Sequence, residues 1–228
     1  MTDKSPVRRP YDATRRREKA RATRRAVVDA ARRLLEERGY AATTVVDVAH
    51  AAGVSPESIF KGFGTKAALV KEVFDVAIAG DDEPVAVADR PEARAVQAEP
   101  DVREKLRLYA EQAAVRAQRS AKVQLVIRNG ASGDPALDEL WQRLQAERLT
   151  GMTMFARHLV GTGGLSVGVE EARDVLWTCI SIEVYDLLIH QRGWSLESYA
   201  EWLARMLVAS LVDASTPGSP AAERAAVD

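Results

Sequence analysis

Three residues with side-chain hydroxyls, Thr44, Ser55 and Thr65, occur within 22 residues, each directly before a segment of helical character. Such residues cap helix starts, where free backbone N–H groups and the positive end of the helix dipole attract phosphate oxygens. Lys61 and Lys66 add positive charge to the same region. This combination predicts the binding of a polyanion, with nucleic acid as the main candidate.

The capping residues also delimit two short helices that form a helix-turn-helix pattern. These helices are expected at 44–52 and 55–61. Gly53 can take the turn between them, Ala49 is small enough for close approach, and Val54 can fill the angle. The second helix of such a unit enters the major groove of DNA with its N-terminal residues on base edges.

Charge is divided unevenly along the 228 residues, whose formal net charge is only −1. Residues 1–71 hold 16 Lys/Arg and 8 Asp/Glu, whereas residues 72–228 hold 16 and 25. The basic first part favours a polyanionic partner, although a basic arm that only aids solubility is an open alternative. The basic side chains that could reach DNA ahead of the first helix are those of Arg15, Arg16, Arg17, Lys19 and Arg21.

The stretches 30–40, 43–55 and 58–69 resemble, in order and spacing, the DNA-binding domain of the TetR family of transcriptional regulators. The resemblance extends over about residues 20–75. It implies that Thr44 and Lys66 contact phosphates at the starts of two helices. It also implies that the helix between them faces the groove through Ser55, Pro56, Glu57, Ser58, Phe60 and Lys61.

Two positions depart from the family pattern. Phe60 stands where the family usually has a tyrosine whose hydroxyl meets a phosphate, and Gly62 stands where it often has histidine. Phe60 can only pack, for example against a thymine methyl, and Lys61 can supply the missing charge. Glu57 has two open roles: it can accept from cytosine N4, or it can stabilise the helix start through the dipole.

Enzyme motifs are absent from the sequence. There is no glycine-rich phosphate loop, no HExxH and no GxSxG, and the three histidines lack metal-ligand spacing. Cys179 lies in an apolar helical run, where an inert thiol is expected. No catalytic residue, metal or cofactor is therefore predicted. The longest stretch without a charged residue, 158–169, is too short to span a membrane, and a cytoplasmic location is expected.

The second part of the chain predicts long helices at about 101–129, 135–160, 169–191 and 195–213. Polar side chains on their apolar stripes are typical of small-molecule pockets, although the same stripes can form a plain core. Arg148 falls inside such a stripe and needs a partner, either an anionic ligand or an internal carboxylate. The expected ligand contacts are Tyr109, Arg116, Gln124, Trp141, Arg148, Met152, Phe155 and Trp177.

These observations predict an all-α protein with an N-terminal three-helix helix-turn-helix DNA-binding domain and a C-terminal helical ligand-binding and dimerisation domain. The expected function is a DNA-binding regulator, a repressor released from a palindromic operator by a small molecule. A homodimer is expected through residues 169–213, because its symmetry would match that of the operator. An interaction adaptor without specific DNA binding and an enzyme with its site in the helical bundle are the alternatives. The expected segments are a flexible basic arm at 1–20, a DNA-binding domain at 21–79, a helical domain at 80–213 and a disordered tail at 214–228.

Overall fold

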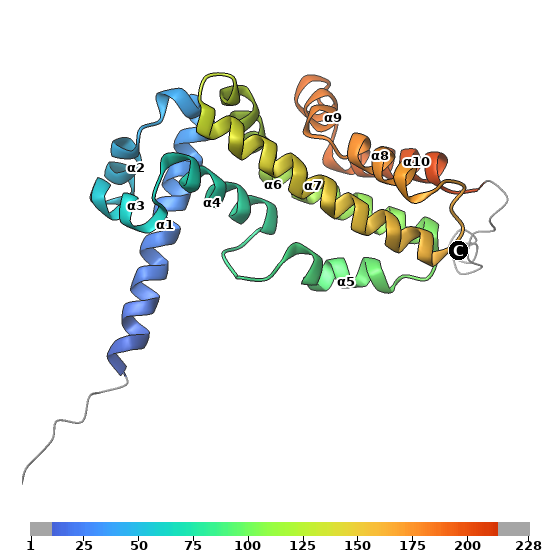
Figure 1. Cartoon of the computed structure of the whole chain (residues 1–228), viewed down its shortest axis with the longest axis horizontal. Coiled ribbons are helices and arrows are strands. Elements are labelled where there is room, and N and C mark those ends of the chain that lie inside the picture. Colours follow the sequence, from blue (N-terminus) through green and yellow to red (C-terminus); the bar gives the residue numbers. More distant parts are fainter. Residues whose placement is uncertain (1–10, 214–228) are drawn as a thin grey trace, which may run out of the picture. The chain divides into compact units, whose positions relative to one another are not determined.

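The computed structural model describes the backbone of residues 11–213 and the side chains of residues 14–213 (Figure 1). Within this range the chain is built from helices, and the one β-type pairing is an isolated bridge between Leu165 and Val212. The expectation of an all-α fold is confirmed. The chain divides into two units between Val73 and Phe74, earlier than the predicted division between 79 and 80.

The N-terminal unit contains the helix-turn-helix. It consists of α1 (Tyr11–Ala42), α2 (Val45–Ala52), α3 (Pro56–Phe63) and the first part of α4 (Lys66–Ala79). Apolar residues at helical spacing on each of these helices are buried together, which fixes the short helices against the long one. The buried core includes Val27, Val28, Ala31, Leu34, Leu35, Val48, Ala49, Ile59, Leu69, Val70 and Val73.

The start of α1 differs from the sequence prediction. The helix begins at Tyr11, whereas a start near residue 23 and a flexible arm over 1–20 were expected. Residues 11–26 are rich in Ala, Arg and Lys and contain no glycine or proline, so intrinsic propensity favours a helix without burial. The side chains of 14–20 are exposed. The rest of the expected arm, residues 1–10, and the expected tail, residues 214–228, lie outside the described residues.

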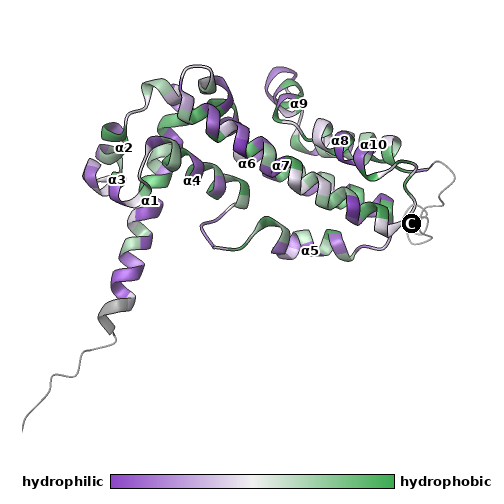
Figure 2. Cartoon of the chain, viewed as in Figure 1, coloured by the Kyte–Doolittle hydropathy of each residue, from purple (hydrophilic) through white to green (hydrophobic). Residues whose placement is uncertain are grey.

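The C-terminal unit is a set of packed helices around an apolar core. Buried residues of α6, α7, α8 and α10 form this core, and Figure 2 shows hydrophobic and hydrophilic residues interspersed along the same helices. α10 packs on α6, and α8 packs on α7. The unit contains, in order after α4, η1 (Val87–Asp89), α5 (Pro91–Ala98), α6 (Val102–Ala131), α7 (Pro135–Thr162), α8 (Val169–Cys179), α9 (Ile182–Tyr185), η2 (Asp186–Gln191) and α10 (Leu196–Leu211).

The single helix predicted over 169–191 is wrong. The chain leaves the helical conformation at Ser181, whose φ and ψ of −66° and 149° are extended. The Ser181 side chain then accepts a hydrogen bond from Val184 N at 3.3 Å and so caps α9. Serine competes in this way with the helical backbone, a local effect that apolar periodicity does not reveal.

Candidate nucleic-acid interface

The junction between α1 and α2 depends on Gly39 and Thr43. Gly39 has a φ of 77°, which lets the backbone leave the straight part of α1 at low cost. Thr43 is buried, and its hydroxyl donates to Gly39 O at 2.8 Å and lies 3.1 Å from Leu34 O. This hydroxyl therefore satisfies carbonyl groups that the end of the helix leaves without intrahelical partners.

A reciprocal capping box fixes the start of α2. Thr44 Oγ1 accepts from Asp47 N at 3.1 Å, and Thr44 N donates to Asp47 Oδ2 at 3.1 Å. The Thr44 hydroxyl also donates to Asp47 Oδ2 at 2.6 Å, and the bonds from Thr44 lower the pKa of the Asp47 carboxyl. Thr44 is exposed, so the predicted phosphate contact is sterically open, but a phosphate would compete with Asp47 for the hydroxyl proton.

Gly53 makes the tight turn into α3. Its φ and ψ of 67° and 32° are left-handed, and its N–H reaches the last carbonyls of α2. Ser55 then caps α3 by accepting from Ser58 N at 3.3 Å, and Pro56 occupies the first turn. Ile59 is buried and holds the inner face of α3 against the unit. The predicted helix-turn-helix is therefore present at 45–63.

The outer face of α3 carries the residues expected to meet base edges. Ser55, Glu57, Ser58, Phe60 and Lys61 are all exposed, with Phe60 at 52% of its full accessible area. An exposed aromatic side chain on an otherwise polar helix is available for apolar contact, as expected where Phe60 replaces a tyrosine. The pKa of Glu57 is lowered by bonds from its own backbone amide and from Ser55, so its carboxylate stabilises the helix start.

Lys66, predicted to contact a phosphate, has a structural partner as well. Its ammonium donates to Tyr40 O at 2.6 Å and lies 3.7 Å from the centre of the Tyr40 ring. It therefore joins the start of α4 to the end of α1 while remaining half-buried. An ammonium has three protons, so these contacts leave the predicted phosphate contact possible.

Sequence reasoning missed two residues of this unit. Arg24 of α1 donates to Glu72 Oε1 at 2.8 Å and to Gly62 O at 3.3 Å, and its guanidinium stacks over Phe63 at 4.4 Å. It thus fastens α1 to the end of α3 and to α4. Val46 at the start of α2 is 63% exposed and extends the apolar part of the surface. Neither residue has a spacing signal, since both roles depend on contacts between helices.

A basic groove lies beside α3. It has a volume of about 630 Å³ and runs between α1 and α3, with Ser58, Gly62 and Phe63 on one wall. Arg16, Lys19 and Arg21 line the other wall together with Arg24, and all four are exposed. The basic residues expected to act from a flexible arm are therefore presented by a helix next to the predicted recognition helix.

The N-terminal unit matches known regulators in sequence. Residues 27–73 match the family model described as bacterial regulatory proteins, tetR family. This match assigns the N-terminal unit to the tetR family. The HTH-type transcriptional regulator TtgR of Pseudomonas putida is 41% identical over 61 residues, which are 27% of this chain. The matched region covers only 29% of the length of TtgR.

Solved structures match over most of the chain. NalD of Pseudomonas aeruginosa, the secondary repressor of the MexAB-OprM multidrug efflux pump, has a TM-score of 0.66 at 20% identity, covering 86% of this chain and 99% of NalD. FadR of Bacillus subtilis in complex with stearoyl-CoA has a TM-score of 0.63 at 17% identity, covering 81% and 97%. At these identities the likeness establishes the fold, which is that of TetR-type regulators.

The residues predicted to contact a ligand fall into separate groups in the C-terminal unit. Tyr109 is buried and stacks on Phe155 with ring centres 4.2 Å apart, and its hydroxyl donates to Met152 Sδ at 3.4 Å. Burial raises the pKa of Tyr109. Trp141 packs against the same core, whereas Gln124 donates to Ser120 Oγ at 2.9 Å on α6.

Arg148 and Trp177 form a second contact. The Arg148 guanidinium lies 4.6 Å from the Trp177 ring centre and donates to Trp177 O and to Gln145 Oε1. Desolvation lowers the pKa of Arg148. Arg148 Nε and Trp177 Nε1 are buried without a hydrogen-bond partner, so this place can accept a polar atom. The partner expected for Arg148 is thus partly a carbonyl group rather than a carboxylate.

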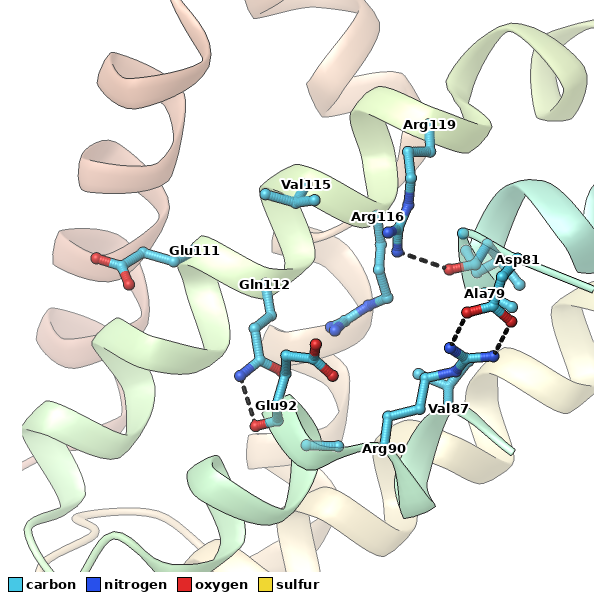
Figure 3. Close-up of a pocket in the computed structure, with 13 residues that line it drawn as sticks. Ala79, Asp81, Val87, Arg90, Glu92, Glu111, Gln112, Val115, Arg116 and Arg119 are labelled. Carbon is cyan, nitrogen blue, oxygen red and sulfur yellow. Dashed lines mark hydrogen bonds and ion pairs between the residues drawn. The ribbon is translucent and has the colours of Figure 1, made fainter. Parts of the chain in front are cut away.

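Arg116 belongs to a different feature, a pocket of about 320 Å³ (Figure 3). The pocket is formed by the end of α4, the segment 80–90, the first turn of α5 and one face of α6. Arg90 and Arg119 line it as well, and neither was predicted. They escape sequence reasoning because Arg90 follows an irregular segment and Arg119 lies on a mixed helical face.

Other chemistry finds little support in residues 11–213. No group of three or more His, Cys, Asp or Glu in this range could hold a metal ion. Burial raises the pKa of the half-buried Cys179 thiol, which reduces its thiolate fraction. None of the helices in the same range combines the length and apolar character that a membrane span requires.

Proposed function

We propose that this protein is a sequence-specific DNA-binding transcriptional regulator, a repressor released from its operator by a small molecule. The observation that carries the proposal is the helix-turn-helix of the N-terminal unit, with the exposed polar face of α3 beside a basic groove. The tetR family match over residues 27–73 supports the same reading. FadR with stearoyl-CoA and the repressor NalD supply precedents for the ligand and for repression in the same fold.

The proposed DNA contacts divide into two kinds. Ser55, Ser58 and Phe60 read base edges, since they occupy the exposed start and face of α3. Thr44, Lys61 and Lys66 anchor phosphates, since two of them are cationic and one stands at a helix N-terminus. Pro56 sets the start of α3, and Glu57 stabilises it. Arg16, Lys19 and Arg21 add attraction that does not depend on sequence.

The proposed regulator is a homodimer through residues 169–213. Leu187 of η2 and Met206 of α10 are 51% and 39% exposed, large apolar side chains that a second copy would cover. A two-fold dimer would place two α3 helices on half-sites one groove repeat apart, about 34–36 Å. The effector is proposed to change this separation by binding in the C-terminal unit, at Arg116 or around Tyr109, Gln124, Trp141, Arg148, Met152, Phe155 and Trp177.

The test is selection of bound fragments from random double-stranded DNA by the full chain, at two salt concentrations. Recovery of one palindromic sequence is expected, with two half-sites about 10–10.5 base pairs apart. On that operator, Lys61→Ala should lower the slope of log affinity against log salt by about 1. Lys122→Ala, which removes an exposed lysine from α6, is the matched control and should leave the slope unchanged.

Sequence-blind binding at low salt, with no enriched motif, would refute the regulator proposal. That result would favour an interaction adaptor, the alternative to which the loss of tyrosine and histidine at Phe60 and Gly62 points. Ser58→Ala separates the two further. A regulator should change its preferred bases when Ser58 is altered, by about 1–3 kcal/mol at the contacted position, whereas an adaptor should not.

A further inference from the structure

We propose that the pocket lined by Arg90, Arg116 and Arg119, here named the arginine pocket, binds a small organic carboxylate. The proposal rests on the regulatory function proposed above, because it makes this carboxylate the effector. It differs from the groups around Tyr109 and Arg148, whose side chains pack mainly against one another. All residues of the arginine pocket belong to the C-terminal unit.

The charges around the pocket do not balance. Arg90 is paired with Asp81 through two bonds of 2.6 and 2.8 Å, and Glu111 is paired with Arg107 outside the pocket. Arg116 and Arg119 then face the pocket with Glu92 as the remaining carboxylate of the lining. The lining therefore carries one positive charge in excess, which a bound monoanion would neutralise.

The two arginines are placed to hold an anion between them. Figure 3 shows the Arg116 side chain extending from α6 toward the first turn of α5, with the Arg119 side chain beside it. On its other side, the Arg116 guanidinium lies 5.6 Å from the Tyr109 ring centre. Burial and the charges of Arg116 and Arg90 lower the pKa of Arg119. A carboxylate would relieve this repulsion and match the fork of guanidinium donors.

The rest of the lining fits an apolar group rather than a phosphate. Val87, Ala93 and Val115 contribute to the walls, so the ligand needs a hydrocarbon part next to its charge. A phosphate, which carries up to two negative charges and no apolar surface, would exceed the positive charge and leave these walls in contact with water. The volume of about 320 Å³ limits the ligand to a small molecule.

Arg119 connects the pocket with α4. Its guanidinium donates to Ile78 O in the last turn of α4 at 3.1 Å and lies against Gly80, where an added Cβ would be 2.4 Å from Arg119 Nη1. A carboxylate in the pocket would compete with Ile78 O for the same guanidinium. Since α4 begins at Lys66, a proposed DNA anchor, the ligand would act on a helix that also belongs to the DNA-binding unit.

The experiment measures binding to the full chain in the absence of DNA, by calorimetry and ligand-observed NMR. Hexanoate and benzoate are the carboxylate probes, hexan-1-ol is the neutral match, and inorganic phosphate is the second anion. Saturable binding of a carboxylate probe is expected, with none of the alcohol. Arg116→Gln should weaken it by at least about tenfold, as expected for the loss of a charge-assisted hydrogen bond.

Arg143→Gln, at an exposed arginine of α7, is the matched control and should leave carboxylate binding unchanged. Arg116→Lys, which keeps the charge, should retain part of the binding. Circular dichroism and the thermal midpoint without ligand establish that each variant is folded. No saturable binding of either carboxylate, equal binding to the Arg116→Gln variant, or stronger binding of phosphate would each overturn the proposal.

The two proposals fail in distinguishable ways. Selection of an operator without carboxylate binding would overturn only the arginine pocket as an effector site. Carboxylate binding without selection of any operator would overturn the regulator and, with it, the effector role of the pocket. If both hold, saturating carboxylate should lower operator affinity in the unmodified chain and leave it unchanged in Arg116→Gln.

Discussion

Lys66 offers a direct separation of stability from DNA anchoring, through the variant Lys66→Met. Methionine keeps most of the side-chain stem but removes the charge that lies 2.6 Å from Tyr40 O and 3.7 Å from the Tyr40 ring centre. A hydrogen bond from a charged group contributes about 1.5–3 kcal/mol, and a cation over a ring about 0.5–1 kcal/mol. Because Lys66 is half-buried, solvent reduces the sum, and we expect a loss of about 1–2 kcal/mol.

Two assays report on this variant. Native-state hydrogen exchange gives the free energy of opening of the N-terminal unit separately from that of the C-terminal unit. The salt dependence of operator binding gives the number of phosphate contacts, and Lys66→Met should lower that slope by about 1. Lys122→Met, at an exposed lysine of α6, should change neither quantity.

Each part of the reasoning on Lys66 can be refuted alone. An unchanged opening free energy would mean that the contacts with Tyr40 contribute nothing to stability. An unchanged salt slope, with stability reduced, would mean that Lys66 only joins α4 to α1 and does not touch a phosphate.

Three further outcomes follow from the same structure. Thr43→Val should destabilise the N-terminal unit by about 1–2 kcal/mol in urea unfolding, because Gly39 O loses its buried partner, whereas Thr43→Ser should keep that bond. Gly53→Ala should cost about 1–2 kcal/mol at its φ of 67°, and the control Gly62→Ala in α3 should be stabilising. The pKa of Asp81 is lowered to about 2 by Arg90, from 3.8. The stability that Asp81 adds over Asp81→Asn is therefore present above pH 3.8 and lost between 3.8 and about 2, in acid titrations of unfolding.

Local sequence signals located most helix boundaries. Thr44, Ser55 and Pro135 mark starts, and Gly53 marks an end, because caps and turns depend on residues within one turn of the chain. Two boundaries failed for physical reasons. The exposed start of α1 has no apolar stripe to mark it, and Ser181 breaks an apolar run that reads as one helix.

The candidate sites were predictable to different degrees. The exposed residues of α3 follow from a short pattern, so the sequence indicated them directly. The arginine pocket brings together Asp81, Arg90 and Arg119 from three elements, and no periodicity links them. Only Arg116 among the predicted ligand contacts lines it. Contacts between distant segments depend on tertiary packing, which a single sequence does not display.

The two units differ in how far apart along the chain their packed elements lie. In the N-terminal unit, α1 packs on α2 and α2 on α3, its immediate successor. In the C-terminal unit, α10 packs on α6, so that core closes only when residues 196–211 are available. Folding rates fall as contacts become less local. The N-terminal unit should therefore acquire its structure early during synthesis, before the C-terminal core can form. A nascent chain would then present a completed α3 to nucleic acid while the proposed effector and dimer surfaces are still unfolded.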